Sequence, residues 1–233
     1  TVSFPKLARY IQGKSKKLAV LYVNNDFGKG GQATIKGLLA TGPTQIVAEI
    51  STESGQVDFS AAVIQAKQSG ADALFAYTNE EESARLLREL RKQGWNKPVI
   101  GETVLTSAKV VELAGEAANG AVAHVGLTVE APQLQAFGRR YQAEFKTVSD
   151  HNGVKGYTAV YVLKAAIEKS GKVDRKAAAA AIRNSCFSAK QHPGILMDVC
   201  FDDKGDIDRE SFITEIRNGK TVVAETLPPL NKK

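Results

Sequence analysis

Two kinds of hydrophobic pattern alternate along the first half of the chain. Short runs of consecutive apolar residues, such as K-L-A-V-L-Y-V at residues 17–23, are typical of strands buried on both faces of a parallel sheet. Between these runs, apolar residues recur every three or four positions, which is typical of helices. The pattern predicts strands at residues 17–23, 45–50, 73–77 and 98–100, and helices at residues 1–13, 32–40, 58–69 and 80–93. Strands that alternate with helices predict a parallel sheet with helices on both faces.

The pattern changes after about residue 122. A strand-like stretch at residues 121–129 precedes three predicted helices, at residues 133–145, 157–170 and 174–184, the last with Asp174 as its N-cap. The middle helix has an apolar face that needs a sheet to pack against, and no such sheet is evident in the sequence. This face includes Val160, Leu163, Ala166 and Ile167. We therefore expect Val160, Leu163 and Ile167 to form an exposed apolar face.

The last part of the chain has a third pattern, in which short apolar stretches are separated by turn residues. Residues 194–201, 211–216 and 221–223 are predicted strands, joined by turns at residues 202–206 and at Asn218-Gly219. The acidic stretch at residues 202–208 could suggest calcium, but its glycine stands at the fourth position rather than the sixth. A solvated hairpin turn is the favoured interpretation.

Composition and charge exclude several functions. The chain of 233 residues is 43% hydrophobic, and it has 31 Lys and Arg against 25 Asp and Glu, a net charge of +6. The basic residues are spread among acidic ones, which argues against nucleic-acid binding because a binding face needs concentrated positive charge. No stretch approaches the ~20 apolar residues of a membrane span. We expect a protein that does not span the membrane, whose signal peptide has been removed.

Catalytic and metal-binding patterns are absent from the sequence. His124, His151 and His192 stand in different segments, and none has the surroundings of a catalytic triad. His151, beside Asp150 and Asn152, is predicted to lie in a polar loop. There is neither C-x-x-C nor H-x-x-x-H. We therefore predict no catalytic residue, no metal and no cofactor.

The two cysteines leave two alternatives open. Thirteen residues separate Cys186 from Cys200, a spacing that permits a disulfide if both lie near one loop. Two buried thiols without a bond are the other alternative.

The stretch V-N-N-D-F-G-K-G-G at residues 23–31 follows a predicted strand and invites comparison with nucleotide-binding loops. It matches neither G-x-G-x-x-G nor G-x-x-x-x-G-K-[ST], and Asp26 places a negative charge where a phosphate would lie. The sequence favours a tight turn between strand and helix, in which the glycines provide the backbone angles. Ligands of open α/β sheets nevertheless bind at the carboxyl ends of the strands.

That rule selects candidate ligand-binding residues at three strand ends. These residues are Phe27; Tyr77, Thr78 and Asn79; and Glu102 and Thr103. An aromatic ring, hydroxyl and amide groups and one carboxylate would suit a small zwitterionic or polar solute. The alternative is local: Tyr77 belongs to the core and Glu102 caps a helix.

Four stretches of the sequence follow the order of a known family. They are K-K-L-A-V-L-Y-V-N-N-D-F-G-K-G, V-D-F-S-A-A-V-I-Q-A-K-Q-S-G-A-D-A-L-F-A, L-L-R-E-L-R-K-Q-G-W-N-K-P-V-I-G and F-D-D-K-G-D. This order resembles the branched-chain amino-acid binding proteins of ABC transporters, which are type I periplasmic binding proteins. The resemblance runs along essentially the whole chain.

The resemblance implies two Rossmann-like α/β lobes joined by three crossovers. By this template, residues 1–122 and 207–233 form the C-terminal lobe, and residues 123–206 form the returning helices of an incomplete N-terminal lobe. The sheet that the three later helices should cover would belong to an N-terminal part outside this sequence.

The resemblance also implies a function. It implies a periplasmic, extracytoplasmic component of an ABC importer that binds an amino acid or another small carboxylate by hinge closure, partners an ABC permease and performs no catalysis. Phe27 would lie against the ligand, Tyr77 to Asn79 would offer further contacts, and Glu102 or Thr103 would take the place of the acid that pairs with the ligand ammonium. If Thr103 takes that place, an aromatic acid or another small carboxylate is favoured instead.

Two further alternatives stay open. A ligand-sensing receptor domain of the same fold would couple binding to signalling, and a nucleotide-using α/β enzyme would bind ATP or NAD at residues 28–31.

An oxidising periplasm would permit the bond between Cys186 and Cys200.

Overall fold

The chain forms two compact units. A computed structural model describes residues 3–230, so that residues 1–2 of the first predicted helix lie outside the described part. One unit, here called the sheet unit, contains residues 3–125 and 213–225; the other, the helical unit, contains residues 126–212 and 226–230. The assignment of either unit to a lobe of the family template stays a prediction.

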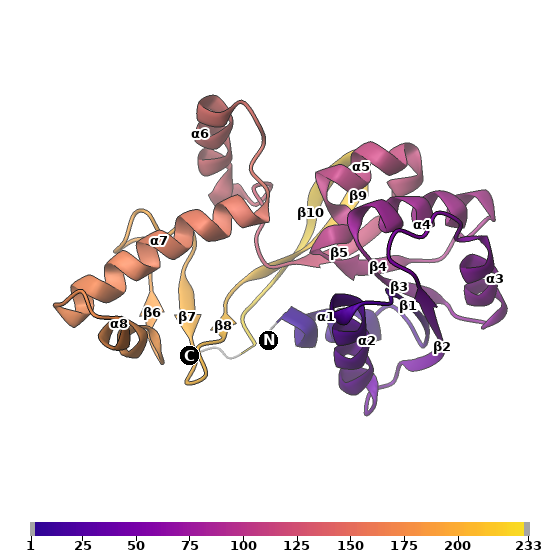
Figure 1. Cartoon of the computed structure of the whole chain (residues 1–233), viewed down its shortest axis with the longest axis horizontal. Helices are drawn as coiled ribbons and strands as arrows, with labels where there is room; N and C mark the ends of the chain where they lie inside the picture. Colours follow the sequence, from indigo (N-terminus) through magenta and orange to yellow (C-terminus); the bar gives the residue numbers. More distant parts are fainter. Residues whose placement is uncertain (1–2, 231–233) are drawn as a thin grey trace. The chain divides into compact units, whose positions relative to one another are not determined.

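A seven-stranded sheet is the centre of the sheet unit (Figure 1). Its elements are α1 (Ser3–Gln12), β1 (Lys17–Val23), α2 (Asp26–Leu39), β2 (Gln45–Thr52), α3 (Ser60–Gln68), β3 (Ala73–Tyr77), α4 (Glu80–Lys92), β4 (Val99–Glu102), the 3-10 helix η1 (Thr103–Thr106), α5 (Ala108–Ala114), η2 (Gly115–Ala118), β5 (Ala121–Val125), β9 (Ser211–Arg217) and β10 (Lys220–Leu227). The strand order is β10-β9-β5-β4-β3-β1-β2, and all the pairs from β2 to β5 are parallel. The predicted α/β class with a parallel sheet is confirmed.

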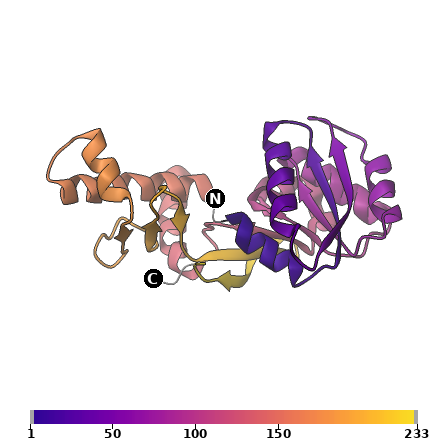
Figure 2. The same ribbon diagram turned by 90° about the horizontal axis from the view of Figure 1, so that it is seen from below.

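Helices cover both faces of this sheet. Helices α1 and α2 pack together on one face, and α3, α4 and α5 lie on the other (Figures 1 and 2). On the first face, Leu18 and Val20 of β1 are completely buried against Leu7 and Ile11 of α1 and Ile35 of α2. Burying each of these side chains contributes roughly 1.5–3 kcal/mol, which explains why a short apolar run between two helical patterns forms a central strand.

A tight hairpin joins β9 to β10. Both residues of its turn, Asn218 and Gly219, have positive φ angles, 50° and 70°. This is the backbone of the two-residue turn that matches the twist of an antiparallel pair, and Asn-Gly is its preferred sequence. The predicted turn is confirmed. The hairpin is fixed to the rest of the unit where the buried hydroxyls of Thr106 and Thr214 form a hydrogen bond of 2.7 Å.

The helical unit contains three helices and a small antiparallel sheet. Its elements are η3 (Pro132–Leu134), α6 (Gln135–Phe145), α7 (His151–Ser170), α8 (Arg175–Ile182), β6 (Cys186–Phe187), β7 (Val199–Phe201) and β8 (Ile207–Asp208). Val162 and Ala166 of α7 pack against Phe187 and Val199 of the sheet. As predicted, Asp174 caps α8, and its carboxylate accepts a hydrogen bond from the Ala177 N–H.

A disulfide joins Cys186 to Cys200. The two residues lie directly opposite each other in the antiparallel pair β6–β7, with their Cα atoms 4.0 Å apart. Of the two alternatives left open by the sequence, the structure has the disulfide.

Three sequence predictions for the helical unit are wrong, and one short strand was not predicted. Helix α7 begins at His151 rather than at residue 157, because Asp150 is a strong N-cap whose carboxylate accepts hydrogen bonds from the N–H groups of Asn152 and Gly153. His151 therefore lies in a helix and not in a loop. The strand predicted at residues 194–201 is reduced to Val199–Phe201, and β6 was not predicted at all. Strands of two or three residues are too short to show a periodicity.

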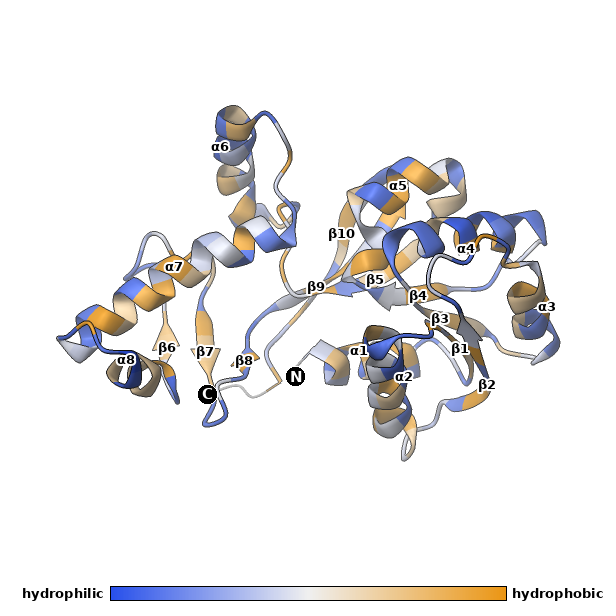
Figure 3. Cartoon of the chain, viewed as in Figure 1, coloured by the Kyte–Doolittle hydropathy of each residue, from blue (hydrophilic) through white to orange (hydrophobic). Residues whose placement is uncertain are grey.

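The small sheet covers only one side of α7. Val160 and Leu163 are 66% and 49% exposed, whereas Ala166 is buried and Ile167 is half-buried. Figure 3 shows apolar and polar positions mixed along this helix. The predicted exposed face is therefore present at Val160 and Leu163, while the core side of the same helix has a sheet that the sequence did not reveal.

Candidate functional site

The candidate site is built at one edge of the parallel sheet, where β1, β3 and β4 end. Tyr22 near the end of β1 pairs with Tyr77 at the end of β3, and Ala76 pairs with Gly101 of β4. The segments that follow these strands therefore start from neighbouring positions. This is the edge at which open α/β sheets bind ligands.

The stretch after β1 is a helix and not a turn. Helix α2 begins at Asp26, with Asn25 as its N-cap, and the Asn25 side-chain oxygen accepts a hydrogen bond of 2.9 Å from the Gly28 N–H. The prediction that this helix begins at residue 32 is wrong. None of Gly28, Gly30 and Gly31 has a positive φ angle, so these glycines do not provide turn angles.

Two of these glycines permit close packing. A Cβ atom on Gly28 would lie 1.8 Å from the Val23 carbonyl oxygen, and one on Gly31 would lie 2.2 Å from the ring of Tyr77, whereas Gly30 has no such neighbour within 4 Å. Glycine was read in the sequence as a signal for a turn, but here it allows α2 to approach β1 and β3. The geometry of a phosphate loop is absent from this stretch.

An aromatic cluster lines the edge. The ring of Phe27 stacks on that of Tyr77 with a centroid distance of 4.3 Å and an interplanar angle of 21°. Phe4 and Phe75 also contact Tyr77, at 5.7 Å and 5.8 Å. Phe27 is 43% exposed and therefore offers an open apolar surface, held in place by the tyrosine behind it.

The Tyr77 phenol stays protonated throughout the physiological range. Burial, followed by the negative charge of Glu102, raises the pKa of Tyr77 to about 12. The hydroxyl is consequently both a donor and an acceptor of hydrogen bonds for a polar ligand.

Thr78 and Asn79 are occupied by local contacts. Thr78 is buried, and its hydroxyl forms a hydrogen bond of 2.8 Å with that of Ser83. Asn79 stands at the N-cap position of α4, and its side-chain amide donates to Glu82 over 3.1 Å. The structure therefore brings Phe27, Tyr77 and Glu102 toward one another and leaves the Thr78 hydroxyl in the interior.

Glu102 is the carboxylate of the edge. It is the last residue of β4, and its Oε2 accepts a hydrogen bond of 2.7 Å from the N–H of Thr103, the first residue of η1. Its Oε1 lies 3.6 Å from Nδ1 of His124 on β5, and its side chain is 22% exposed. Burial raises the pKa of Glu102, but contact with His124 and Thr103 outweighs this effect and lowers the pKa below its usual value. The group is an anion at neutral pH.

The local alternative for Glu102 is therefore correct as a description of its contacts, since the side chain does cap η1. A cap and a ligand-binding carboxylate are compatible, because each carboxylate oxygen has two lone pairs. His124 was missed by the sequence analysis. In the sequence, the signal that could have identified His124 was its place near the end of the strand at residues 121–125. Its pairing with Glu102 could not be predicted, because it depends on the register between β4 and β5.

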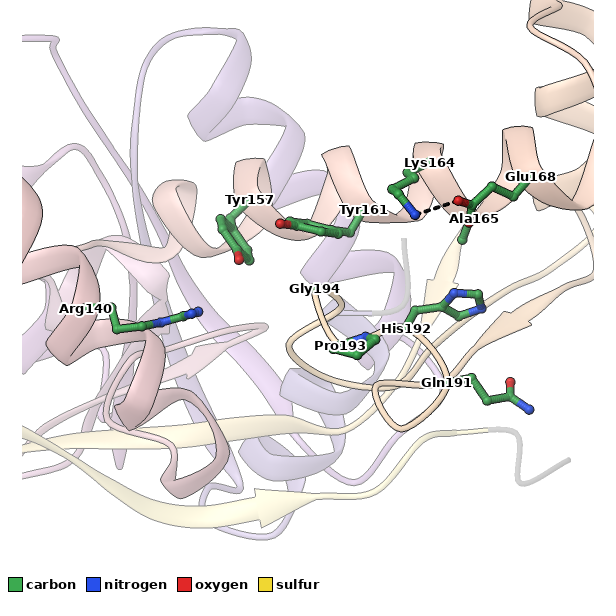
Figure 4. Close-up of a pocket in the computed structure, with 10 residues that line it drawn as sticks. All are labelled: Arg140, Tyr157, Tyr161, Lys164, Ala165, Glu168, Gln191, His192, Pro193 and Gly194. Carbon is green, nitrogen blue, oxygen red and sulfur yellow. Dashed lines mark hydrogen bonds and ion pairs between the residues drawn. The ribbon is translucent and has the colours of Figure 1, made fainter.

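A separate hollow of about 400 Å³ lies within the helical unit (Figure 4). Its lining includes Arg140 of α6, Tyr157 and Tyr161 of α7, and the loop at residues 191–194. Lys164, also in the lining, is paired with Glu168 at 2.6 Å. None of the ligand-binding residues predicted from the sequence lines this hollow.

Within residues 3–230, no group of three or more metal-ligating side chains is found, and no helix is long and apolar enough to cross a membrane. Asp202 shows how the acidic stretch is used instead. Its Oδ1 accepts hydrogen bonds of 2.9 Å and 2.8 Å from the N–H groups of Lys204 and Asp206, which closes a turn as predicted.

Comparison with known proteins decides the family, since residues 2–221 match the model of the family described as "Periplasmic binding protein". The chain belongs to the periplasmic binding protein family. The resemblance inferred from the sequence is thereby confirmed.

Two curated members of the periplasmic binding protein family show how the chain relates to its relatives. Over 200 residues, it is 24% identical to the leucine-, isoleucine-, valine-, threonine- and alanine-binding protein of Pseudomonas aeruginosa. This match covers 85% of this chain and 52% of the relative. It is 28% identical over 216 residues to a Leu/Ile/Val-binding protein of Rhizobium johnstonii, covering 91% and 57%. The chain thus spans little more than half the length of these relatives.

Solved structures of periplasmic binding proteins share the fold. A leucine-binding protein from Thermotoga maritima superimposes with a TM-score of 0.81 at 22% identity, covering 97% of this chain and 65% of the other. A solute-binding protein of an ABC transporter from R. palustris, in complex with benzoate, gives a TM-score of 0.80 at 19% identity, covering 98% and 63%. These values show a common fold and leave the solute of this chain to be inferred from its own residues.

Proposed function

We propose that the chain is part of an extracytoplasmic solute-binding component of an ABC importer, which binds a small solute at the carboxyl edge of its parallel sheet. The observation that carries this proposal is the stack of Phe27 on Tyr77, an exposed aromatic surface close to the ionised Glu102. An apolar surface beside a fixed charge suits a solute with an apolar side chain and one cationic group.

An α-amino acid fits this edge better than an aromatic acid. The Glu102 carboxylate attracts an ammonium group and repels a carboxylate at the same place. The relative from Pseudomonas aeruginosa binds leucine, isoleucine, valine, threonine and alanine by its name, whereas the protein from R. palustris was solved with benzoate. The charge of Glu102 favours the first class for this chain.

Binding would be coupled to transport by hinge closure. In this proposal, residues 1–122 and 207–233 form one lobe, residues 123–206 belong to the other, and contacts made only when the lobes close shift the equilibrium toward the closed form. An ABC permease would recognise that closed form. The solute would be released unchanged, so the proposal includes no catalytic step.

Isothermal titration of the full-length natural protein with L-leucine and with benzoate tests the proposal. We expect binding of leucine, with a loss of about fivefold or more in affinity for Phe27→Ala and for Glu102→Gln, since each removes a contact worth about 1–3 kcal/mol. Phe145→Ala, an exposed aromatic of the helical unit, and Glu116→Gln, an exposed acid at η2, are the matched controls. Retention of full affinity by both site variants contradicts the proposal.

A further inference from the structure

His124 stands beside the carboxylate of the proposed site. It pairs with Glu102 in the β4–β5 register, its side chain is 1% exposed, and its Nδ1 lies 3.6 Å from Oε1 of Glu102. A separation of 3.6 Å exceeds the length of a hydrogen bond, but a buried imidazole at this distance still interacts electrostatically with a carboxylate because little water screens them.

The two oxygens of Glu102 thus have neighbours in two directions. The Thr103 N–H fixes Oε2 from the chain itself, and His124 faces Oε1 from the neighbouring strand. Tyr77, on the opposite neighbour β3, is a further titratable side chain that interacts with this carboxylate, whose charge contributes to the raised pKa of the tyrosine. Glu102 therefore has a titratable partner on each of the two strands beside its own.

We propose that His124 is a positioning residue for solute binding, which holds the Glu102 carboxylate in the orientation that receives the ammonium group of an amino-acid solute. This inference rests on the proposed function. A free glutamate side chain has several rotamers, and fixing one of them before binding reduces the entropy lost when the solute arrives. The lone pairs of Glu102 that the Thr103 N–H does not use remain available to the ammonium.

The first test uses no solute. The carboxyl carbon of Glu102 is followed by ¹³C NMR through a pH titration of the wild type, His124→Phe and His124→Asn. Because contact with His124 lowers the pKa of Glu102, we expect its midpoint to rise in His124→Phe, which fills the space with a ring that cannot donate. His124→Asn, which retains a donor, should shift the midpoint less. His192→Phe, in the helical unit, is the control and should leave it unchanged.

The second test compares L-leucine with 4-methylpentanoate, which has the same carbon chain and carboxylate and no amino group. In the full-length protein, His124→Phe should lower the affinity for leucine about tenfold and alter that for the analogue much less. A role confined to packing would weaken both solutes equally. If His124→Phe does not fold, as judged by its melting curve, the same comparison is made with His124→Asn, for which we expect a smaller loss in the same direction.

The outcomes are distinct. An unchanged midpoint for Glu102 in the His124 variants, or an equal loss of affinity for both solutes, overturns the role of His124. Absence of leucine binding in the wild type overturns the proposed function, and the NMR titration then still decides whether His124 sets the state of Glu102.

Discussion

Gly31 of α2 lies against the ring of Tyr77 so closely that a Cβ atom on the glycine would be 2.2 Å from the ring carbon Cε1. The contact joins a helix and a strand through two residues that are 77 − 31 = 46 positions apart in the sequence. It also holds the ring on which Phe27 stacks. A residue with no side chain therefore determines where the exposed aromatic surface of the proposed site can stand.

Gly31→Ala should destabilise the sheet unit. The methyl group would push the Tyr77 ring or α2 aside, and overpacking of this kind costs about 1–3 kcal/mol. Gly30→Ala is the matched control, because a Cβ there meets nothing within 4 Å and alanine favours a helix over glycine by about 1 kcal/mol. Urea unfolding measures both variants. Equal shifts in their free energies of unfolding would contradict the contact.

The contribution of Glu102 to stability should depend on pH. Its pKa is lowered in the folded protein, so the ionised form is stabilised by folding, and this contribution is present above the usual pKa of 4.5 and is lost as pH falls through the lower folded value. Glu102→Gln removes it. The difference in free energy of unfolding between wild type and Glu102→Gln should be larger at pH 7 than at pH 3. A difference that is constant between these values would argue against the ionised state of Glu102.

Reduction of the disulfide should destabilise the helical unit. The bond closes a loop with a sequence separation of 14, and opening a loop of this size costs about 3 kcal/mol by increasing the entropy of the unfolded chain. Cys186→Ser with Cys200→Ser should lower the melting temperature to the value that the wild type shows in a reducing agent. The same agent should leave the double variant unchanged, and any effect on it would point to another cause.

The exposed side of α7 should make the 233-residue chain associate. Val160 and Leu163 are 66% and 49% exposed, and apolar side chains that stay in contact with water favour burial against another surface. Val160→Lys with Leu163→Lys should shift sedimentation of this chain toward the monomer. Val57→Lys, at an apolar residue of the sheet unit that is 75% exposed, is the control. A wild type that sediments as a monomer at all concentrations would contradict the expected association.

The central elements of the sheet unit could be predicted because local pattern and burial agree there. The strands β1 and β3 have the predicted bounds. An uninterrupted apolar run is typical of a strand that helices bury on both faces of a parallel sheet. The end of α4 also follows the prediction to within a residue. The start of α2 did not, because Gly28 and Gly31 serve contacts with Val23 and Tyr77 that the sequence cannot show.

The candidate site was predictable in part for the same reason. The rule that ligands bind at the carboxyl ends of parallel strands selected Phe27, Tyr77 and Glu102 without knowledge of their contacts. It could not select His124, because the pairing of that residue with Glu102 depends on strand register, and it included Thr78, whose hydroxyl is buried. Neither register nor side-chain direction is fixed by residue type alone.

The bond between Cys186 and Cys200 stands just before the last segment of the chain, which carries β9 and β10. These two strands complete the seven-stranded sheet formed with β1 to β5. A protease that cuts the backbone once inside the intervening loop would therefore leave the final strands covalently attached to everything that precedes them. The disulfide makes a single cleavage in the loop at residues 187–199 insufficient to release the edge of the sheet.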